Sequence, residues 1–491
     1  MNHSRWNYTS MRSVAWGMSV CAALSMLAGC ATDQKADVQE YRKISDPPGD
    51  VKVLQAGEPL GLVDALRLTA LHNEQLAIQG ERYVQALAAR QRAAAALLPT
   101  FDLFANVALR ENAGDQGIVQ SDVGLAGQYR LLTGLSDLRN VSAADARIES
   151  ARWLILDLRE SLLVQAAQAY YQTLRAERLT EVLNSSVRAQ AERLADARAR
   201  NEVGFTRPLD VSQIESQVSR TRAQLITAER QAGEARSALK LLTNAEVGTS
   251  TLTDGFESVA GARTLEEMIA LATAHRQDIL AARADAEAAR ALVDAAIGEY
   301  APSLTLNLEY FLVGGPETPD PNLSSLLQLR MPLFSAGRIE AQVREAWSVF
   351  RERVLTYRTR VREMRRDVET SHLRLRASMH LAAELETQVR VATQAVELAE
   401  AAYQAGLGTN LERVVAQDQL LNAELERVSE SFVTKTSELE LLRACGLLSS
   451  EMIGAALPEV PEMSPRSLEA PVLDREEAAR ESSDALPGGG T

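Results

Sequence analysis

Residues 203–217 read VGFTRPLDVSQIESQ, and residues 405–419 read AGLGTNLERVVAQDQ. Positions in the two stretches match at a displacement of 202 residues: Gly204 with Gly406, Phe205 with Leu407, Leu209-Asp210 with Leu411-Glu412, and Gln217 with Gln419. Outward from these stretches, the order of predicted elements in residues 62–243 repeats in residues 265–446. A duplication of this size predicts that the chain is built from two copies of one structural unit.

Each copy opens with a 37-residue helical pattern, at residues 62–98 and 265–301, that is rich in good helix formers. A proline follows each pattern and ends the predicted helix, because proline cannot continue the helical hydrogen bonds. Paired strands come next, at about residues 100–132 and 303–334, where apolar and polar side chains alternate. Each run is about 10 residues long, the length of a tilted β-strand that crosses a membrane.

Three further elements complete each copy: a long helix, a turn and a returning helix. They span about residues 135–201, 203–208 and 209–243 in the first copy, and about 337–404, 405–410 and 411–446 in the second. The long helices would measure roughly 100 Å and the returning helices roughly 50–55 Å. Because the two shorter helices of a copy together match the long one, we expect them to stack end to end beside it. The linker 244–264 would then lie near the middle of the molecule.

The first 29 residues have the features of a signal peptide, with Arg5 and Arg12 before a short apolar stretch. Residues 27–30, LAGC, resemble the lipobox of bacterial lipoproteins. This resemblance implies cleavage before Cys30 and attachment of lipid, such as palmitate, to that residue. The alternative is a signal peptide that holds a cysteine there by chance. Thr32 stands where Asp would retain a lipoprotein at the inner membrane, which favours the outer membrane, with residues 30–61 as a lipid-anchored linker.

The composition argues against several classes of protein. A net charge of −14 is unfavourable for nucleic-acid binding, and the Arg-rich run 351–376 is interspersed with acids, as on a solvated helix face. The mature part has no run of 18 apolar residues, so no transmembrane helix is expected. The C-terminal tail, 447–491, is rich in Pro, Glu, Ser and Gly beyond residue 457, and we expect it to be disordered.

No set of residues in the sequence predicts catalysis or metal binding. His372 and His380 lie two helical turns apart, which is too far for one metal ion. Cys445 stands alone near a helix end and is expected to be a small core residue. No Gly-rich phosphate loop is present. We therefore expect no enzymatic activity, no metal and no cofactor apart from the lipid on Cys30.

The strand count predicts assembly. Four strands cannot close a barrel, because about eight is the smallest useful number. An open sheet cannot face lipid, because the backbone groups at its edges would lack hydrogen-bond partners. Several chains must therefore pool their strands, and three chains would supply twelve, which leaves room for a lumen. This arithmetic favours a trimer but leaves other numbers open.

Together these features resemble the TolC-like outer-membrane efflux proteins. The likeness covers about residues 60–446 and rests on the repeat, the strand pairs, residues 331–338 (MPLFSAGR) and the two glycine turns. The lipobox makes the chain most similar to the lipidated OprM-type branch. The resemblance implies a mostly α fold with a minor β part, in which a trimeric 12-strand outer-membrane β-barrel continues into a long periplasmic α-helical barrel.

The resemblance also implies a function. The chain would be the exit duct of a tripartite efflux system that carries drugs or other small molecules across the outer membrane and so confers antibiotic resistance. Its partners would be two further copies of itself, a periplasmic adaptor protein and an inner-membrane pump. The matching turns of the family dock the adaptor, which implies adaptor contacts at Gly204, Phe205, Thr206, Gly406, Leu407 and Thr409. On the sequence alone, the two glycines are helix caps with no partner implied.

Three residues near these turns are candidates for a pore constriction. Asp210 and Glu412 begin the returning helices, where the helix dipole favours an acid. In a trimer, three copies of each would also ring the narrow end of the lumen and favour cations. Glu412 and Tyr403 match the family's constriction and its latch, although Tyr403 fits an apolar helix seam equally well. The chain departs from the family at Val415, where a second acid is expected, and at Gly408, which replaces an arginine.

Two other functions stay open at this level. The same fold could serve as the exit duct of type I protein secretion, and the loop lengths do not separate the two. A trimeric coiled-coil scaffold lipoprotein without a pore would need one uninterrupted heptad rod, against which the alternating strands argue. The sequence does not name the substrate, the cognate adaptor and pump, or the resting state of the tip.

Overall fold

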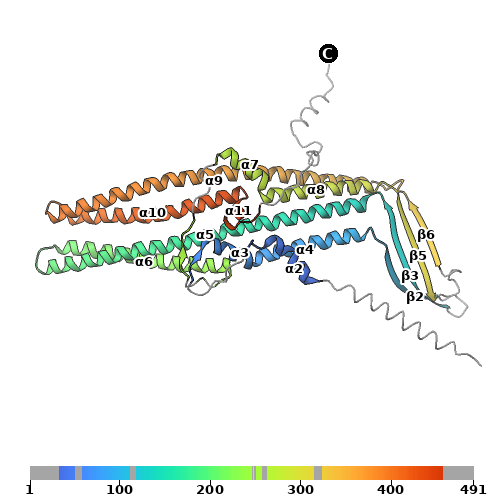
Figure 1. The fold of residues 1–491 in the computed structure, drawn as a ribbon, viewed down its shortest axis with the longest axis horizontal. Coiled ribbons are helices and arrows are strands. Elements are labelled where there is room, and N and C mark those ends of the chain that lie inside the picture. Colours follow the sequence, from blue (N-terminus) through green and yellow to red (C-terminus); the bar gives the residue numbers. More distant parts are fainter. Residues whose placement is uncertain are drawn as a thin grey trace, which may run out of the picture.

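The computed structural model describes residues 33–49, 58–110, 118–245, 247, 250–256, 263–313 and 323–456. These residues form an elongated molecule with a sheet at one end and two helical hairpins at the other (Figure 1). Shorter elements gather around the middle of its length.

Four antiparallel strands form the sheet, in the order β2-β3-β5-β6: β2 (Thr100–Arg110), β3 (Ile118–Thr133), β5 (Ser303–Val313) and β6 (Leu323–Arg330). Each copy of the repeat supplies two strands, and the β3–β5 pairing joins the copies. Within the described part of the chain, β2 and β6 each have one edge without a strand partner. The predicted last run was too long, since β6 ends before Met331 and Leu333. Pro332 has no N–H to donate to a ladder there.

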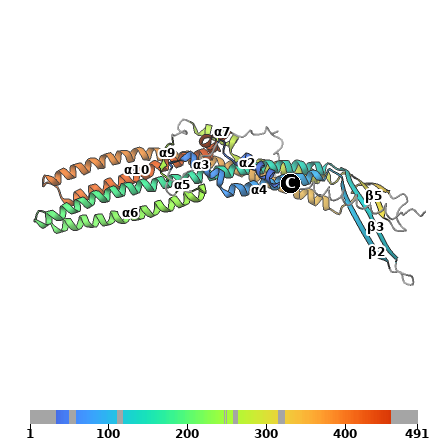
Figure 2. The ribbon, with the colours of Figure 1, turned by 60° about the horizontal axis from the view of Figure 1, so that its bottom comes forward.

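Two helices of 67 residues, α5 (Ser136–Glu202) and α9 (Arg338–Gln404), run from the sheet to the far end (Figure 1). Two helices return along them: α6 (Pro208–Thr243) packs on α5, and α10 (Asn410–Ala444) packs on α9. The two antiparallel hairpins lie side by side (Figure 2). All four helices confirm the sequence prediction to within two residues at each end.

The single long helix predicted at the start of each copy is wrong. The structure has two helices in each place: α3 (Leu62–His72) with α4 (Glu74–Ala95), and α7 (Leu265–His275) with α8 (Gln277–Gly298). Asn73 and Arg276 break the helices with extended ψ angles of 121° and 119°. The Asn73 side chain accepts from the N–H of Gln75 and so restarts the helix as an N-cap. The break lets α3 and α7 turn aside and cover the central core.

Both chain ends hold structure that the sequence did not predict. The linker 30–61 contains α2 (Gln34–Ser45), and the tail 447–491 contains α11 (Leu448–Ile453). Tyr41 of α2 packs on Gly80 of α4, where any Cβ would lie 2.3 Å from the ring. In α11, Leu448 and Ile453 are fully buried, so the apolar side chains at the start of the tail order it. Residues 30–32, 50–57 and 457–491 of these two segments lie outside the described residues.

The largest core lies near mid-length, where α3, α5, α10 and α11 meet, and we call this region the equatorial zone. β1 (Leu60–Gly61) pairs in parallel with β4 (Leu252–Thr253), and both leucines are buried members of this core. The buried Tyr170 hydroxyl lies 2.7 Å from the carbonyl oxygens of both Leu60 and Thr253, and ties these strands to α5. Among the described residues, no helix combines the length and the apolar character needed to cross a lipid bilayer.

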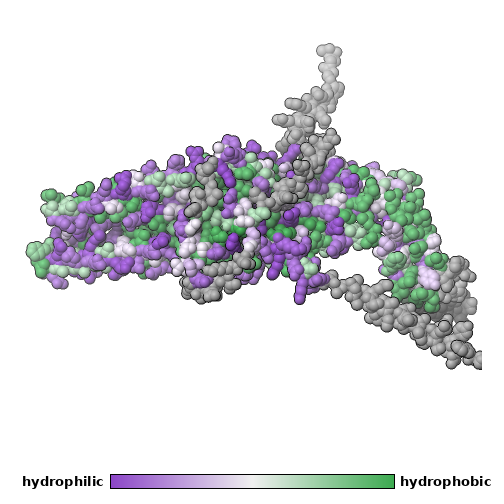
Figure 3. All heavy atoms as spheres, in the orientation of Figure 1, coloured by the Kyte–Doolittle hydropathy of each residue, from purple (hydrophilic) through white to green (hydrophobic). Residues whose placement is uncertain are grey.

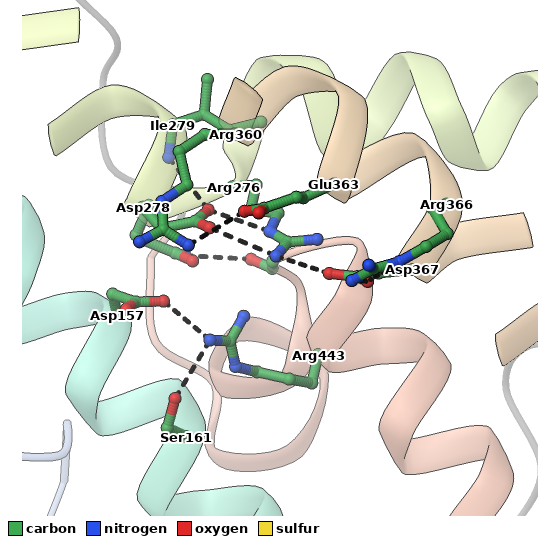
Figure 4. Close-up of polar contacts among 12 residues, drawn as sticks. Asp157, Ser161, Arg276, Asp278, Ile279, Arg360, Glu363, Arg366, Asp367 and Arg443 are labelled. Atoms are coloured by element: carbon green, nitrogen blue, oxygen red, sulfur yellow. Dashed lines mark hydrogen bonds and ion pairs between the residues drawn. The ribbon is translucent and has the colours of Figure 1, made fainter. Parts of the chain in front are cut away.

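Partly buried ion pairs lie in the equatorial zone, and one of them joins the two copies of the repeat (Figure 4). Arg443 of α10 donates to Asp157 at 2.7 Å and to Ser161 at 3.0 Å, both on α5. Arg276 donates to Asp278 and to Asp367 of α9, both at 2.9 Å. Burial raises the pKa of Asp157, an effect that Arg443 opposes. These pairs hold α5, α8, α9 and α10 in register between the sheet and the far hairpins.

Candidate functional site

The first turn joins α5 to α6 at the end opposite the sheet. Gly204 has a φ of 77°, and the N–H of Phe205 donates to the carbonyl of Arg200 at 2.8 Å, which ends α5 in a left-handed cap. The Asn201 amide donates to the carbonyl of Thr206 at 2.6 Å and closes the turn. This geometry presents the Phe205 side chain, 85% exposed, at the end of the hairpin.

The second turn, from α9 to α10, repeats this shape with different contacts. Gly406 has a φ of 72°, and the N–H groups of Leu407 and Gly408 both donate to the carbonyl of Ala402, at 2.9 and 3.0 Å. Leu407 is 87% exposed. All six residues predicted to dock an adaptor lie in these two turns, but only Phe205 and Leu407 present large exposed apolar side chains.

The two acids predicted to line a constriction are both engaged within their own turns. Asp210 is buried and accepts two hydrogen bonds from Arg207, from Nε and Nη2, each at 3.0 Å. Glu412 is exposed and closes a capping box: its carboxylate accepts from the N–H of Thr409 at 2.8 Å, while the Thr409 hydroxyl accepts from its N–H at 3.3 Å. The turn therefore neutralises Asp210, whereas Glu412 keeps a solvent-facing charge.

Two arginines near the tips were missed by sequence reasoning. Arg207 had a signal, because it stands three residues before Asp210, a spacing at which ions pair on a helix. The contacts of Arg413 with Tyr403 and Glu400 had none, because they cross from α10 to α9. Its guanidinium carbon lies 4.2 Å from the centre of the Tyr403 ring and its Nη1 lies 3.6 Å from Glu400. Tyr403 is thus held by a cation within its own hairpin.

Polar contacts join the two hairpins just behind the turns. Asn410 donates to Gln213 at 3.4 Å, and Gln217 donates to Asp418. Arg220 also lies 3.6 Å from Asp418. Burial raises the pKa of Asp418, and the charge of Arg220 opposes this effect. These contacts bring the first turns of α6 and α10, with Asp210 and Glu412, to the same end of the molecule.

Apolar side chains are exposed at both ends of the molecule, while the face between them is mainly hydrophilic (Figure 3). At the sheet end, Phe101 and Leu103 of β2 and Leu327 and Leu329 of β6 are exposed on the two edge strands. At the hairpin end, the exposed apolar residues include Val203, Phe205, Leu209, Leu407 and Leu411. Contiguous apolar surface of this kind marks contact with lipid or with a protein partner.

The remaining predicted site concerns chemistry at cysteine. Cys30 lies outside the described residues. Cys445 is buried in the core, and its burial raises the pKa of the thiol to about 11, so that it stays protonated. In the described part of the chain, no group of three or more His, Cys, Asp or Glu side chains could hold a metal ion.

Comparison with known proteins gives matches to both copies of the repeat. The family model described as "Outer membrane efflux protein" matches residues 66–245 and 268–447. The outer membrane protein TolC of Vibrio cholerae is 25% identical over 369 residues, which span 72% of this chain and 84% of that protein. A probable outer membrane lipoprotein, SilC of Salmonella typhimurium, is 25% identical over 360 residues, 68% of this chain and 74% of its own length.

The fold has solved counterparts as well. The crystal structure of the outer membrane protein VceC from Vibrio cholerae superposes with a TM-score of 0.70 at 21% identity. The alignment covers 78% of this chain and 96% of VceC. At this identity the likeness concerns the fold.

Proposed function

This chain belongs to the outer membrane efflux protein family, and we propose that it assembles as a homotrimer whose twelve pooled strands close a β-barrel. As a member of the family, it is the exit duct of a tripartite efflux system in the outer membrane of a Gram-negative bacterium, with a large periplasmic part. The observation that carries the trimer is the sheet itself. Its two outer strands, β2 and β6, each have one edge without a strand partner within the described chain, and both expose apolar side chains. In a trimer, β6 of one chain would pair with β2 of the neighbouring chain, and this pairing would satisfy the free edges of both strands.

In this assembly the hairpin end is the periplasmic tip. We place the docking of a periplasmic adaptor protein at the two turns, because Phe205 and Leu407 project there from rigid helix caps. The partner would cover these side chains with an apolar surface of its own. An inner-membrane pump then supplies cargo to the adaptor, and this chain serves as a passive duct without a catalytic step.

The constriction of the duct stays a prediction at Asp210, Glu412 and Tyr403. Three copies of Glu412 would place solvent-facing carboxylates around the tip. Three copies of Asp210 would add little charge while Arg207 holds them. Any opening that breaks the Arg207–Asp210 pair would raise the negative charge of the ring and favour cations.

The lipid on Cys30 would hold the start of the chain close to the membrane. Tyr41 of α2 packs on Gly80 of α4. The chain from Gly80 to Thr100, the first residue of β2, spans about 30 Å. From Tyr41 back to Gln34 is about 10 Å of helix, and four extended residues add at most about 14 Å to Cys30. This reach of about 24 Å is comparable to the span to the strands, so a lipid on Cys30 would lie near the sheet end, where we place the membrane.

The cargo we propose is drugs or other small molecules, since the family is named for efflux. Single-particle imaging of the detergent-extracted mature protein tests the assembly. We expect a three-fold, hollow particle about 130–140 Å long, with the sheet end narrower than the cylinder. Channel recording in planar bilayers tests the pore, and should give discrete conductance steps. A solid rod that conducts no ions would instead support a scaffold lipoprotein and contradict the duct.

A further inference from the structure

A cavity of about 750 Å³ opens in the equatorial zone between α2, α5 and the residues that follow α11. Four cationic side chains line it: Arg42 and Lys43 from α2, and Arg152 and Arg159 from α5. Asp46 is the one acid among the described residues of its wall. The cavity therefore holds a clear excess of positive charge, and no part of the proposed efflux function uses it.

Arg159 is the buried member of this set. Only 7% of the residue is exposed, and its Nη1 donates to the carbonyl of Ile44, in the last turn of α2, at 3.0 Å. Its Nε has no hydrogen-bond partner among the described residues, which also place no carboxylate within ion-pair distance of it. A buried guanidinium N–H without an acceptor is unfavourable, so this side chain is prepared for an acceptor that enters the cavity.

The other cations are not neutralised within the cavity either. Lys43 pairs with Glu40 at 2.7 Å and Arg152 with Glu149 at 3.6 Å, but neither acid lines the cavity. Both pairs are exposed to solvent, where such contacts are weak and easily exchanged. An anion in the cavity would meet cations from two different elements, α2 and α5, and would bridge them.

We propose that this cavity binds an oxyanion of the phosphate or carboxylate class and thereby fastens α2 to α5. Guanidinium groups match such oxyanions with paired, charge-assisted hydrogen bonds, and partial burial strengthens them. The bound oxyanion supplies the acceptor that Arg159 Nε lacks and offsets the repulsion between the four cations. Because α2 follows Cys30 by four residues, the site secures the part of the chain that the lipid would pull on.

Two sources could supply the oxyanion. One is free phosphate in the periplasm. The other is the chain itself, since residues 457–491 continue from Ala456, at the cavity wall, and contain eight acidic and three basic residues. Glu459 and Glu462 are the first acids of that segment. Both sources offer the same chemistry to Arg159, and the experiment separates them.

The test is calorimetric titration of the full-length trimer with inorganic phosphate, in chloride buffers of matched ionic strength so that screening is constant. We expect saturable binding, weakened on the order of tenfold by Arg152→Gln, which removes a half-exposed cation. Arg159→Gln should abolish the binding, and Arg152→Gln keeps the test valid if that variant folds poorly. Lys35→Gln, on α2 but outside the cavity, is the matched control and should bind as the wild type does.

The double variant Glu459→Gln/Glu462→Gln, in the full-length chain, distinguishes free phosphate from the chain's own carboxylates as the source of the oxyanion. Phosphate binding that is equal in wild type and variant supports a free anion as the occupant. Binding that appears or tightens only in the variant supports the chain's own carboxylates as the natural occupant. In either case, hydrogen exchange of the α2 amides should slow when the site is filled. The proposal is overturned if neither protein binds phosphate saturably, or if Arg152→Gln and Arg159→Gln leave the binding unchanged.

Discussion

Arg207 shows how one side chain can set the charge of the periplasmic tip. Its two donors occupy both oxygens of Asp210, and the hydrogen bonds and charge of Asp210 raise the pKa of Arg207 in return. The pair is local, so each tip of a trimer would carry it independently.

Glu160 holds the start of α11 in the equatorial zone, where its buried carboxylate accepts from the N–H of Ser449 at 3.0 Å.

Replacing Arg207 should change ion selectivity. In Arg207→Gln the Asp210 carboxylate loses its partner and adds three negative charges to the tip of a trimer, so the channel should become more cation-selective. The reversal potential in a salt gradient across a planar bilayer measures this shift. Arg198→Gln removes the same charge from the exposed Arg198–Glu215 pair of the same hairpin. An equal shift in both variants would mean that net charge, and not Asp210, sets the selectivity.

Glu160 should make stability depend on pH. Burial raises its pKa above the ordinary 4.5, against the hydrogen bonds from Ser449 and the charges of Arg443 and Arg159. The folded state then holds the proton more tightly than the unfolded state. The contribution of Glu160 to stability is therefore full below pH 4.5 and lost as pH rises through the folded-state pKa. Glu160→Gln, which is permanently neutral, should lose less stability over that range.

Thermal unfolding followed by the helical circular-dichroism signal, from pH 4.5 upward, measures this difference. Ser449→Ala keeps the backbone donor but removes the hydroxyl, which opposes the raised pKa of Glu160, so its pH dependence should be at least as large as that of the wild type. Parallel curves for wild type and Glu160→Gln would show that Glu160 does not titrate with unfolding.

At the scale of elements, the sequence predicted what local chemistry decides and missed what packing decides. Proline, glycine and the capping residues Asn244 and Thr409 set ends of α5, α6, α9 and α10, which were predicted to within two residues. The breaks at Asn73 and Arg276 escaped prediction because neither residue type forbids a helix. They follow from the need to cover the equatorial core. The tip residues were found from the repeat, whereas Arg413 was not, because its contacts join two different helices.

The tip glycine and a helix glycine should respond oppositely to the same substitution. Gly406 has a φ of 72° and open space around its Cβ position, so Gly406→Ala should cost roughly 1–2 kcal/mol through backbone strain alone. Gly233, within α6, also has open space, and Gly233→Ala should stabilise by about 0.5–1 kcal/mol. Thermal unfolding compares the two. Stabilisation by both variants would show that the turn at Gly406 tolerates a side chain.

The seating of α2 rests on the contact between Tyr41 and Gly80. In Gly80→Ala the new Cβ would meet the Tyr41 ring at 2.3 Å, so α2 must move, at a cost of about 1–3 kcal/mol. Hydrogen exchange of residues 34–45 should become faster in this variant. Combining it with Tyr41→Leu, which removes the ring, should restore part of the protection. Unchanged exchange in Gly80→Ala would mean that α2 is held mainly by other contacts.

At the scale of the whole molecule, one chain presents two apolar ends joined by a polar helical shaft about 100 Å long. The two ends meet different surroundings. The exposed apolar side chains of the sheet end would be covered by lipid and its free strand edges by neighbouring strands. Those of the tip would be covered by a protein partner that contacts both turns. Damage at one end should therefore leave the other intact, which allows assembly and partner docking to be measured separately.

The tip variant Phe205→Glu/Leu407→Glu should prevent partner docking without preventing trimer assembly. Both side chains are more than 80% exposed, so charge there should not disturb folding, and native mass spectrometry should still find a trimer. A carboxylate buried against an apolar partner is strongly unfavourable, so docking and efflux should be lost. Drug accumulation in cells that rely on this duct measures the loss.

Leu241→Glu, on an equally exposed apolar residue near the equatorial end of α6, is the matched control and should keep efflux. Normal efflux in the tip variant would show that the partner docks on the flanks of the helices and not on the turns.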